Sequence, residues 1–500
     1  MLNYIKLATK DTFIYSLGNI STKLIGLVLI PLYTDEFSTA EYGVLGMVEI
    51  TIQIMVAAFS LSLFQALNRW YWDHKYRDKQ KSIFFTTLVT LIISSILMIF
   101  LFLPFTHKVS QALLDSTEYE YLFSLLLMGA AVQMISRLIL ALMRLQRKAL
   151  LFSLTNILKL VITLGLTIYF ILELDRGLEG IFEAQIIGFL VFFLVNLKFI
   201  LRNIRPVFEG FILKEMLSFS YPLAISSVSG VLLTVTDRYA LRYIGGLDDM
   251  GLYNLGFKVA NILKIFVITS VTSAIVPLKF KMMDKPGSKR FYSKIMTYTA
   301  YGFIILLLLI SLYSKEAIRV LAQNREYWTA YQVVPLLCFA QFFELLRKNA
   351  NFGLVVEKKT KVISYLTILI STLNIGLNIV LVYYFSAMGA ATALLLSQAL
   401  FFVFIYVNAQ RFYSIPYEIK KVMLMIFVGA AIVTISYIFI NDLELLPRIL
   451  LKLLLIILFP VILYFFNFYE PIELNRLKGA WHKWKKPQNW VKNIKNIRIK

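Results

Sequence analysis

The sequence predicts an all-α polytopic membrane protein with about fourteen transmembrane helices. Two six-helix lobes related by a parallel repeat, plus two accessory C-terminal helices, are the expected arrangement. Three observations predict this fold. Hydrophobic residues make up 59% of the 500 residues and charged residues only 16%, whereas soluble domains are about 45–50% apolar and about 25% charged. Long apolar runs recur along the chain, and the connections between them alternate in charge.

The apolar runs are each long enough to cross a bilayer. The first twelve lie near residues 12–33, 43–67, 82–105, 119–143, 150–172, 180–201, 217–243, 252–278, 293–313, 329–353, 362–385 and 389–409. Two more lie near 422–440 and 449–468. We expect the first twelve to form the core and the last two to be accessory.

Alternate connections are rich in Lys and Arg, as in NRWYWDHKYRDKQK and EKKTK, and so is the tail that starts at Arg476. The intervening connections, such as TDEFSTAEY, GGLDDMG and NDLELL, are acidic or nearly neutral. Positive loops stay in the cytoplasm. The bias therefore predicts a multi-pass membrane protein with both termini in the cytoplasm. It also explains the net charge of +22 without nucleic acid as a partner.

A weak internal repeat divides the chain. EYGVLGM after the first run resembles MGLYNLG after the seventh at an offset of about 208 residues, although chance similarity would explain so short a match. We expect an N-terminal lobe at 1–208, a C-terminal lobe at 209–410, two accessory helices at 411–468 and a basic cytoplasmic tail at 469–500. The tail mixes Trp with Lys and Arg and is expected to lie against anionic membrane lipids.

Charged residues inside the runs are costly in a membrane, so they mark functional sites facing a wet or protein-lined interior. The basic ones predicted to bind substrate are Lys23, Arg137, Lys159, Arg238, Lys258, Lys264, Arg347 and Lys348. The acidic Glu49, Asp237 and Glu344 are predicted to act as gate or ion-coupling residues. The surplus of bases predicts an anion-handling cavity; the alternative for Asp237 and Arg238 is mutual neutralisation.

Three further patterns refine this prediction. Asp237 has Arg238 beside it, and Glu344 has bases at i+3 and i+4, whereas Glu49 has none within a turn. Glu49 is thus the candidate site for a coupling H⁺ or Na⁺, its alternative being a hydrogen bond to a neighbouring helix. Asn374 and Asn378 share a helix face and either line the cavity or join two helices. Lys452, near an end of an accessory run, is expected to be dispensable.

The sequence lacks the residues that several classes of chemistry need. The three histidines lie in connections or the tail, and Cys338 is the lone cysteine, so we expect no metal site or disulfide. No phosphate-binding glycine loop is present, so ATP hydrolysis is not expected. An enzyme acting on glycans would be expected to carry a larger external loop. No cofactor is expected.

The opening FIYSLGNISTKLIGLVLIPLYTDEFSTAEYG resembles the start of O-antigen-type polysaccharide flippases, within the multidrug, oligosaccharidyl-lipid and polysaccharide exporter superfamily. TDRYALRYIGG and MGLYNLGFKV resemble the beginning of that family's second half. The resemblance implies two lobes around a cationic cavity, alternating access, and transfer of an undecaprenyl-pyrophosphate-linked oligosaccharide between the leaflets of the bacterial cytoplasmic membrane. It also implies cavity or gate charges at Lys23, Asp237, Arg238 and Lys258; the other site residues follow from their place in apolar runs.

The partners implied are a polyprenyl-pyrophosphate-linked glycan, membrane lipids and glycan assembly proteins. Three alternatives remain at this point. A lipid II flippase has a similarly cationic cavity, and a drug or cation exporter of the same fold calls for an acidic interior. The third alternative, from another class, is a membrane-embedded glycan transferase.

Overall fold

The computed structural model describes residues 26–475 except 269–274, 276–278, 280, 281, 284, 285 and 358. Lys23, most of the first predicted run and the basic tail from residue 476 onward lie outside the described residues. The described part is all-helical, as predicted, and contains no strand. Ten of its helices are long and apolar enough to cross a membrane, or eleven if a pair bent by 43° counts as one span. The total of fourteen stays a prediction.

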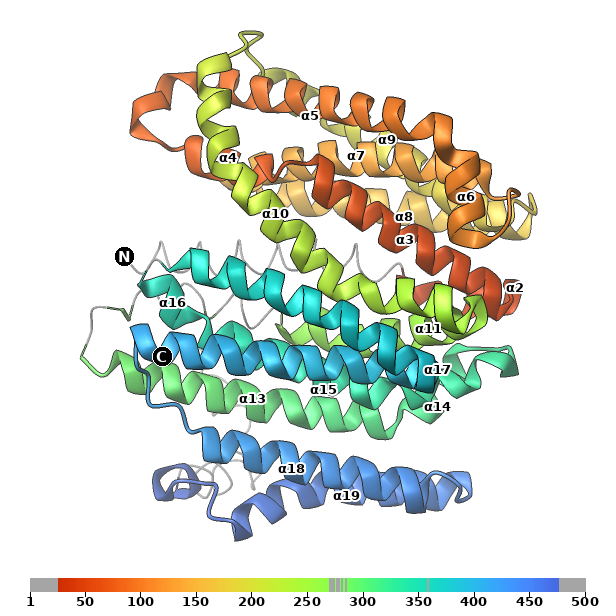
Figure 1. Cartoon of the computed structure of the whole chain (residues 1–500), viewed down its shortest axis with the longest axis vertical. Coiled ribbons are helices and arrows are strands. Elements are labelled where there is room, and N and C mark those ends of the chain that lie inside the picture. The colour runs from red at the N-terminus through yellow and green to blue at the C-terminus, as the bar shows by residue number, and fades with distance from the viewer. Residues whose placement is uncertain are drawn as a thin grey trace, which may run out of the picture.

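The helices follow the predicted runs closely and lie alongside one another (Figure 1). The first group is α2 (Ile30–Glu36), α3 (Thr39–Phe59), α4 (Leu63–Trp70), α5 (Gln80–Phe102), α6 (Thr106–Leu114), α7 (Glu120–Leu145), α8 (Ala149–Leu172) and α9 (Gly177–Arg202). The second is α10 (Gly210–Ala240), α11 (Leu247–Leu263), α13 (Ser288–Leu312), α14 (Ser314–Leu321), α15 (Val334–Ala350), α16 (Phe352–Val356) and α17 (Thr360–Phe412). The last two are α18 (Ile419–Ile435) and α19 (Leu445–Phe465).

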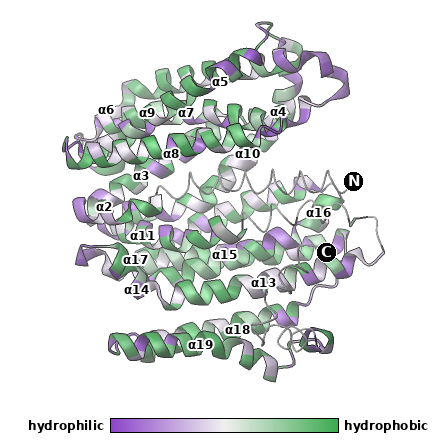
Figure 2. Cartoon of the chain, turned by 180° about the vertical axis from the view of Figure 1, so that it is seen from behind, coloured by the Kyte–Doolittle hydropathy of each residue, from purple (hydrophilic) through white to green (hydrophobic). Residues whose placement is uncertain are grey.

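The connections gather at two opposite ends of the bundle, with apolar helix between them (Figure 2). At one end, which we call the basic end, Glu209 accepts a hydrogen bond of 2.9 Å from Lys79, and Glu215 accepts one of 2.8 Å from Tyr76. At the other, the acidic end, Thr39 donates to Asp248 at 2.5 Å. The basic and acidic connections that alternate along the sequence thus lie at opposite ends of the bundle.

Helix α17 contains both of the predicted runs 362–385 and 389–409, because it turns back on itself at Ser386, where φ is 44°. Across the turn, Asn374 donates to Ser397 at 2.9 Å. A Cβ at Gly389 would lie 1.9 Å from the carbonyl oxygen of Leu381, so only glycine fits there. Asn374 and Asn378 are both fully buried: Asn374 joins the two arms of the hairpin, and Asn378 donates to Asn374 on its own arm.

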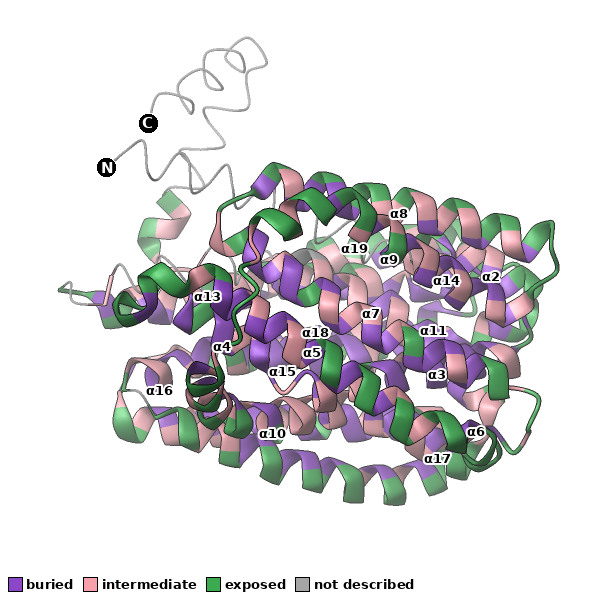
Figure 3. Cartoon of the chain, turned by 90° about the horizontal axis from the view of Figure 1, so that it is seen from above, coloured by how far each residue is buried: buried purple, intermediate pink, exposed green. Residues whose placement is uncertain are grey.

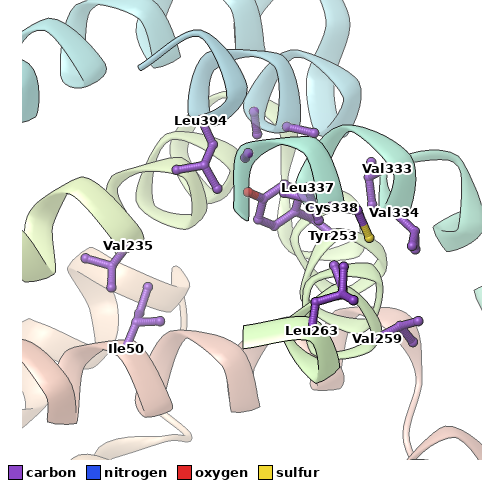
Figure 4. Close-up of a cluster of buried hydrophobic side chains, with 14 of the residues drawn as sticks. Ile50, Val235, Tyr253, Val259, Leu263, Val333, Val334, Leu337, Cys338 and Leu394 are labelled. Carbon is purple, nitrogen blue, oxygen red and sulfur yellow. The ribbon is translucent and has the colours of Figure 1, made fainter. Parts of the chain in front are cut away.

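Helix α10 crosses between the two groups of helices (Figure 1). Its first half, with Ile212 and Met216, belongs to an apolar cluster formed otherwise by α4, α5, α7, α8 and α9. Its second half contacts the other group as well: Ser371 of α17 donates to the Ser229 carbonyl oxygen at 2.7 Å. Val235 belongs to the buried cluster that includes Tyr253 and Leu394, and it lies beside Ile50 of α3 (Figure 4). A division of the chain at 208/209 therefore falls just before a helix that contacts both groups.

Two ion clusters fasten the accessory pair α18 and α19 to the rest. At the basic end, Lys294 contacts Glu418 at 2.9 Å and Glu470 at 2.5 Å. At the acidic end, Glu316 contacts Arg448 at 2.7 Å and Lys452 at 2.9 Å. The expectation that Lys452 is dispensable rested on its place near the end of an accessory run, but its side chain is fully buried. Seen from above, buried residues concentrate inside the bundle and exposed ones on its outer surface (Figure 3).

Candidate functional site: a cationic cavity between the two groups of helices

Two adjoining hollows lie inside the bundle, with volumes of about 590 and 540 Å³. The larger is lined by residues of α3, α7, α9, α10 and α11, and the smaller by residues of α3, α4, α7, α8 and α9. They share Gly26, Glu49, Gln133, Arg137 and Gln185, so we treat them as one cavity. Its size is that of a site for a substantial ligand or ligand head group.

Five of the predicted substrate-binding residues line this cavity: Arg137, Lys159, Arg238, Lys258 and Lys264. Arg347 and Lys348 are not among its lining residues; Arg347 lies 4.2 Å from the Phe401 ring centroid and Lys348 pairs with Glu344 at 2.9 Å. Asp237 is buried behind the wall, and Lys23 lies outside the described residues.

Arg137 on α7 and Lys159 on α8 form no ion pair with an acidic side chain in the described part of the chain. Arg137 instead donates to Gln133, one turn earlier, at 2.7 Å. The Lys159 ammonium lies 4.3 Å from the Phe189 ring centroid, a cation–π contact. Gly188 keeps α8 and α9 close, since a Cβ there would lie 2.2 Å from Thr163. Both cations therefore face the cavity with their charge uncompensated.

Arg238 on α10 does not form an ion pair with Asp237 within the described residues, although the two are neighbours. Asp237 accepts from the backbone N–H of Arg238 at 2.8 Å and from the hydroxyl of Tyr253. The Arg238 guanidinium lies 3.9 Å from the Phe257 ring centroid, and its Nε has no hydrogen-bond partner among the described residues. The two side chains thus form no direct ion pair, although the Arg238 charge still acts on the Asp237 carboxylate.

Lys258 of α11 and Lys264, which directly follows α11, are paired across long sequence distances. Lys258 lies 3.3 Å from Glu49 on α3, and Lys264 lies 3.0 Å from Glu344 on α15. Glu49 has no base within a turn of its own helix, but it is not an isolated acid: it accepts a hydrogen bond from a neighbouring helix, which is the alternative given for it. Glu344 does pair with its neighbour Lys348, as the spacing predicted, but also with Lys264, which the spacing did not reveal.

Uncharged polar residues complete the lining and were not predicted. The larger hollow includes Gln53, Gln133, Gln185, Asn254 and Asn261. Their amides donate and accept hydrogen bonds, which suits hydroxyl-rich ligands. A scan for amides inside apolar runs, in addition to charges, would have found them.

At the acidic end of the bundle, α3 and α11 approach each other closely. A Cβ at Gly43 would lie 2.3 Å from the carbonyl oxygen of Leu247, and one at Gly251 would lie 2.0 Å from that of Thr39. The offset of 208 residues relates Gly43 to Gly251 and Thr39 to Leu247, so this contact is two-fold symmetric about the repeat. Tyr327 adds hydrogen bonds of 2.8 Å to the carbonyl oxygens of Phe37 and Ser38.

These features define a multi-pass membrane protein with a cationic interior. A family of polysaccharide biosynthesis proteins matches residues 8–283, and the chain belongs to this family. It is 23% identical over 304 residues to a Haemophilus influenzae protein of the Lsg locus, covering 59% of this chain and 71% of that protein.

Solved transporters share the fold. The lipid II flippase MurJ, in an inward closed conformation, superposes with a TM-score of 0.70 at 14% identity, covering 93% of this chain and 100% of that one. A MOP-superfamily transporter from Pyrococcus furiosus gives 0.62 at 13% identity, covering 84% and 96%. At such identities the likeness establishes the fold. Together with the family match, it confirms the expected kinship with the polysaccharide flippases of that superfamily.

Proposed function

We propose that this protein is a flippase that moves an undecaprenyl-pyrophosphate-linked oligosaccharide across the bacterial cytoplasmic membrane for surface polysaccharide assembly. The observation that carries the proposal is the cavity lined by Arg137 and Lys159, two cations without an acidic partner in the described residues. Cations in a protected site replace the hydration shell of a phosphate with charge-assisted hydrogen bonds. Arg238, with its unpartnered Nε, adds a third contact on the opposite wall.

The remaining chemistry of the cavity suits the glycan. The amides of Gln133, Gln185 and Asn261 offer donors and acceptors for sugar hydroxyls. The lipid chain would stay in the surrounding bilayer while the head crosses through the cavity. Family membership in polysaccharide biosynthesis supports a glycan as cargo.

Two alternatives are separated by specific observations. A drug or cation exporter would need free acidic groups, but Glu49 is the one carboxylate lining the two hollows in the described residues, and Lys258 compensates it. A lipid II flippase shares the pyrophosphate chemistry, and the superposition on MurJ keeps that reading as the second candidate. The lipid II flippase and the proposed oligosaccharide flippase differ in the glycan that each moves.

We further propose that residues 1–208 and 209–410 move relative to each other in alternating access, with 411–468 as accessory helices. The loop charge bias supports an arrangement with the basic end and both termini in the cytoplasm. Glycan assembly proteins are proposed partners. Coupling to H⁺ or Na⁺ stays a prediction without an assigned residue, because Glu49 is paired.

The test uses purified full-length protein in vesicles that contain a fluorophore-labelled polyprenyl-pyrophosphate oligosaccharide. Dithionite destroys label in the outer leaflet alone, so the fraction destroyed reports movement between leaflets. We expect rapid movement with the wild type and a loss of at least about tenfold with Arg137→Gln/Lys159→Gln, since two charged hydrogen bonds disappear. Lys198→Gln, an exposed cation on α9 outside the cavity, is the matched control. Unchanged movement in the double variant would refute the proposal.

A further inference from the structure

Helices α3 and α11 meet along one continuous line of contacts, which we call the seam. From the acidic end inward, it comprises Thr39 with Asp248, Gly43 with Gly251, Gly46 with Asn254 and Glu49 with Lys258. Each pair lies about one helical turn from the next. The seam therefore links the first and second groups of helices from the end of the bundle to the cavity.

The glycine contacts in the middle of the seam supply close packing but no charge. A Cβ at Gly46 would lie 2.6 Å from the side-chain amide nitrogen of Asn254, so the α3 backbone lies directly against that side chain. At the acidic end of the seam, the buried Thr39 donates a hydrogen bond to the exposed Asp248, so one neutral and one charged partner meet there. The inner pair, Glu49 with Lys258, is the ion pair of the seam.

This inner pair is also the part of the seam that a ligand can reach. The Glu49 side chain is 34% exposed, that of Lys258 is 14% exposed, and both line the larger hollow. Lys258 is held in place by the Tyr42 ring, whose centroid lies 4.9 Å from the ammonium. One carboxylate oxygen at 3.3 Å is a modest partner compared with the several oxygens of a diphosphate.

We propose that Glu49 and Lys258 form a latch that the anionic head of the cargo opens. The head takes the Lys258 ammonium away from Glu49 and repels the carboxylate that remains. The two groups of helices then lose their polar link at the cavity end of the seam and separate at the acidic end. The inference rests on the proposed function, since it assigns the cargo's charge as the trigger. A ligand shifts such an equilibrium only through its different affinity for the two states, and the freed Lys258 supplies that difference.

The experiment measures the distance between spin labels at Glu118→Cys, between α6 and α7, and Gln323→Cys, after α14. Both positions lie at the acidic end, one in each group of helices (Figure 1). The full-length protein carries Cys338→Ser to remove its buried cysteine. Inorganic pyrophosphate is the probe, and its binding is measured separately by calorimetry. In the protein with Glu49 intact, pyrophosphate should raise the ratio of long to short distances by about fivefold or more.

Glu49→Gln should produce the same rise without pyrophosphate, while still binding pyrophosphate. Lys258→Gln should also produce it, and should show no further response to pyrophosphate. Glu183→Gln is the matched control, because its ion pair with Arg176 stays within the first group of helices. It should leave the distances unchanged.

Distances in Glu49→Gln and Lys258→Gln that match those with both residues intact would overturn the latch. So would pyrophosphate that binds the protein without shifting the distances, and in that case the proposed function would stand. Absence of pyrophosphate binding would count against the proposed function. The ligand-free comparison with Glu49→Gln would then still decide whether the pair holds the seam closed.

Discussion

Gly43 and Gly251 lie against each other across the seam: a Cβ at Gly251 would stand 3.2 Å from the backbone nitrogen of Gly43. The atoms nearest to an added methyl group are backbone atoms, which cannot rotate away. Gly43→Ala should therefore force α3 and α11 apart, at a cost of about 1–3 kcal/mol for overpacking. The expected result is a longer distance between labels at Glu118→Cys and Gln323→Cys without any ligand, and slower lipid movement in vesicles.

Gly165→Ala is the control for that change. Gly165 lies on α8, and a Cβ there would meet nothing within 4 Å. The substitution should leave both the distance and the rate of movement unchanged. Equal behaviour of Gly43→Ala and Gly165→Ala would show that the close approach is not needed to hold the acidic end shut.

Arg238 tests whether the geometry of a guanidinium is required, as opposed to its charge. Its side chain lies over Phe257 and donates to the carbonyl oxygen of Thr234 at 3.1 Å, which aims the planar group along the cavity wall. Arg238→Lys keeps the charge but not the fork of donors. We expect it to weaken pyrophosphate binding by roughly tenfold, and Arg238→Gln by more, because charged hydrogen bonds contribute about 1.5–3 kcal/mol each. Calorimetry on purified protein measures both, and equal affinity of Arg238→Lys and wild type would contradict the expectation.

The sequence was sufficient to place the long helices of the described residues. Apolar length marks a span because a bilayer has a fixed thickness, so predicted runs and observed helices agree closely. The offset of 208 residues proved informative because it aligns Gly43 with Gly251, which touch in the structure. Where another backbone approaches closely, only glycine fits, so the residue type at that position is strongly constrained.

The pairing of charges was beyond sequence reasoning. Spacing along one helix finds partners such as Glu344 and Lys348, which are one turn apart. It cannot find Lys258, which is 209 residues from Glu49 and reaches it because two helices cross. The boundary between the lobes is hard to predict from sequence for the same reason, since only packing shows that α10 contacts both groups of helices.

The sequence did not reveal the ion pair of Lys452 for the same reason, because its partner Glu316 lies on another helix. The environment of Lys452 gives a prediction. Its ammonium lies 2.9 and 3.0 Å from the two carboxylate oxygens of Glu316, and it is fully buried. Lys452→Met should lower the melting temperature in detergent, because it leaves Glu316 with Arg448 as its remaining partner. Loss of one partner of a buried pair costs about 3–5 kcal/mol, and we expect less here because Arg448 remains. The exposed Lys361→Met should melt like the wild type. Equal melting of the Lys452 variant and the wild type would show that the cluster does not fasten α19.

The orientation in the membrane gives a prediction that needs no purified protein. Reporter fusions at Asp78 and Pro286, at the basic end, should report cytoplasm, and fusions at Asp115, Asp248 and Asp442, at the acidic end, should report the outside. Phosphatase and fluorescent-protein reporters give opposite readouts and check each other. An external signal at Pro286 would exclude the proposed arrangement.

The last prediction concerns acid and the accessory helices. Burial raises the pKa of the Glu418 carboxyl, but hydrogen bonds from Lys294, Thr297 and Lys421 lower it more, so the pKa lies below the ordinary value of 4.5. Because the folded-state pKa is depressed, the stabilisation is fully present above pH 4.5 and is lost as the pH falls through the folded-state value.

Acid should therefore loosen the cluster that joins Glu418 and Glu470 to Lys294 at the basic end. We expect the melting temperature of the wild type to fall below pH 4.5, and that of Glu418→Gln to be lower at neutral pH but to fall less in acid. The two curves should converge, since protonation and the substitution remove the same charge. Glu36→Gln, an exposed acid that forms no ion pair in the described residues, should follow the wild type at every pH. Parallel curves for Glu418→Gln and the wild type would show that this carboxylate does not hold α18 through its charge.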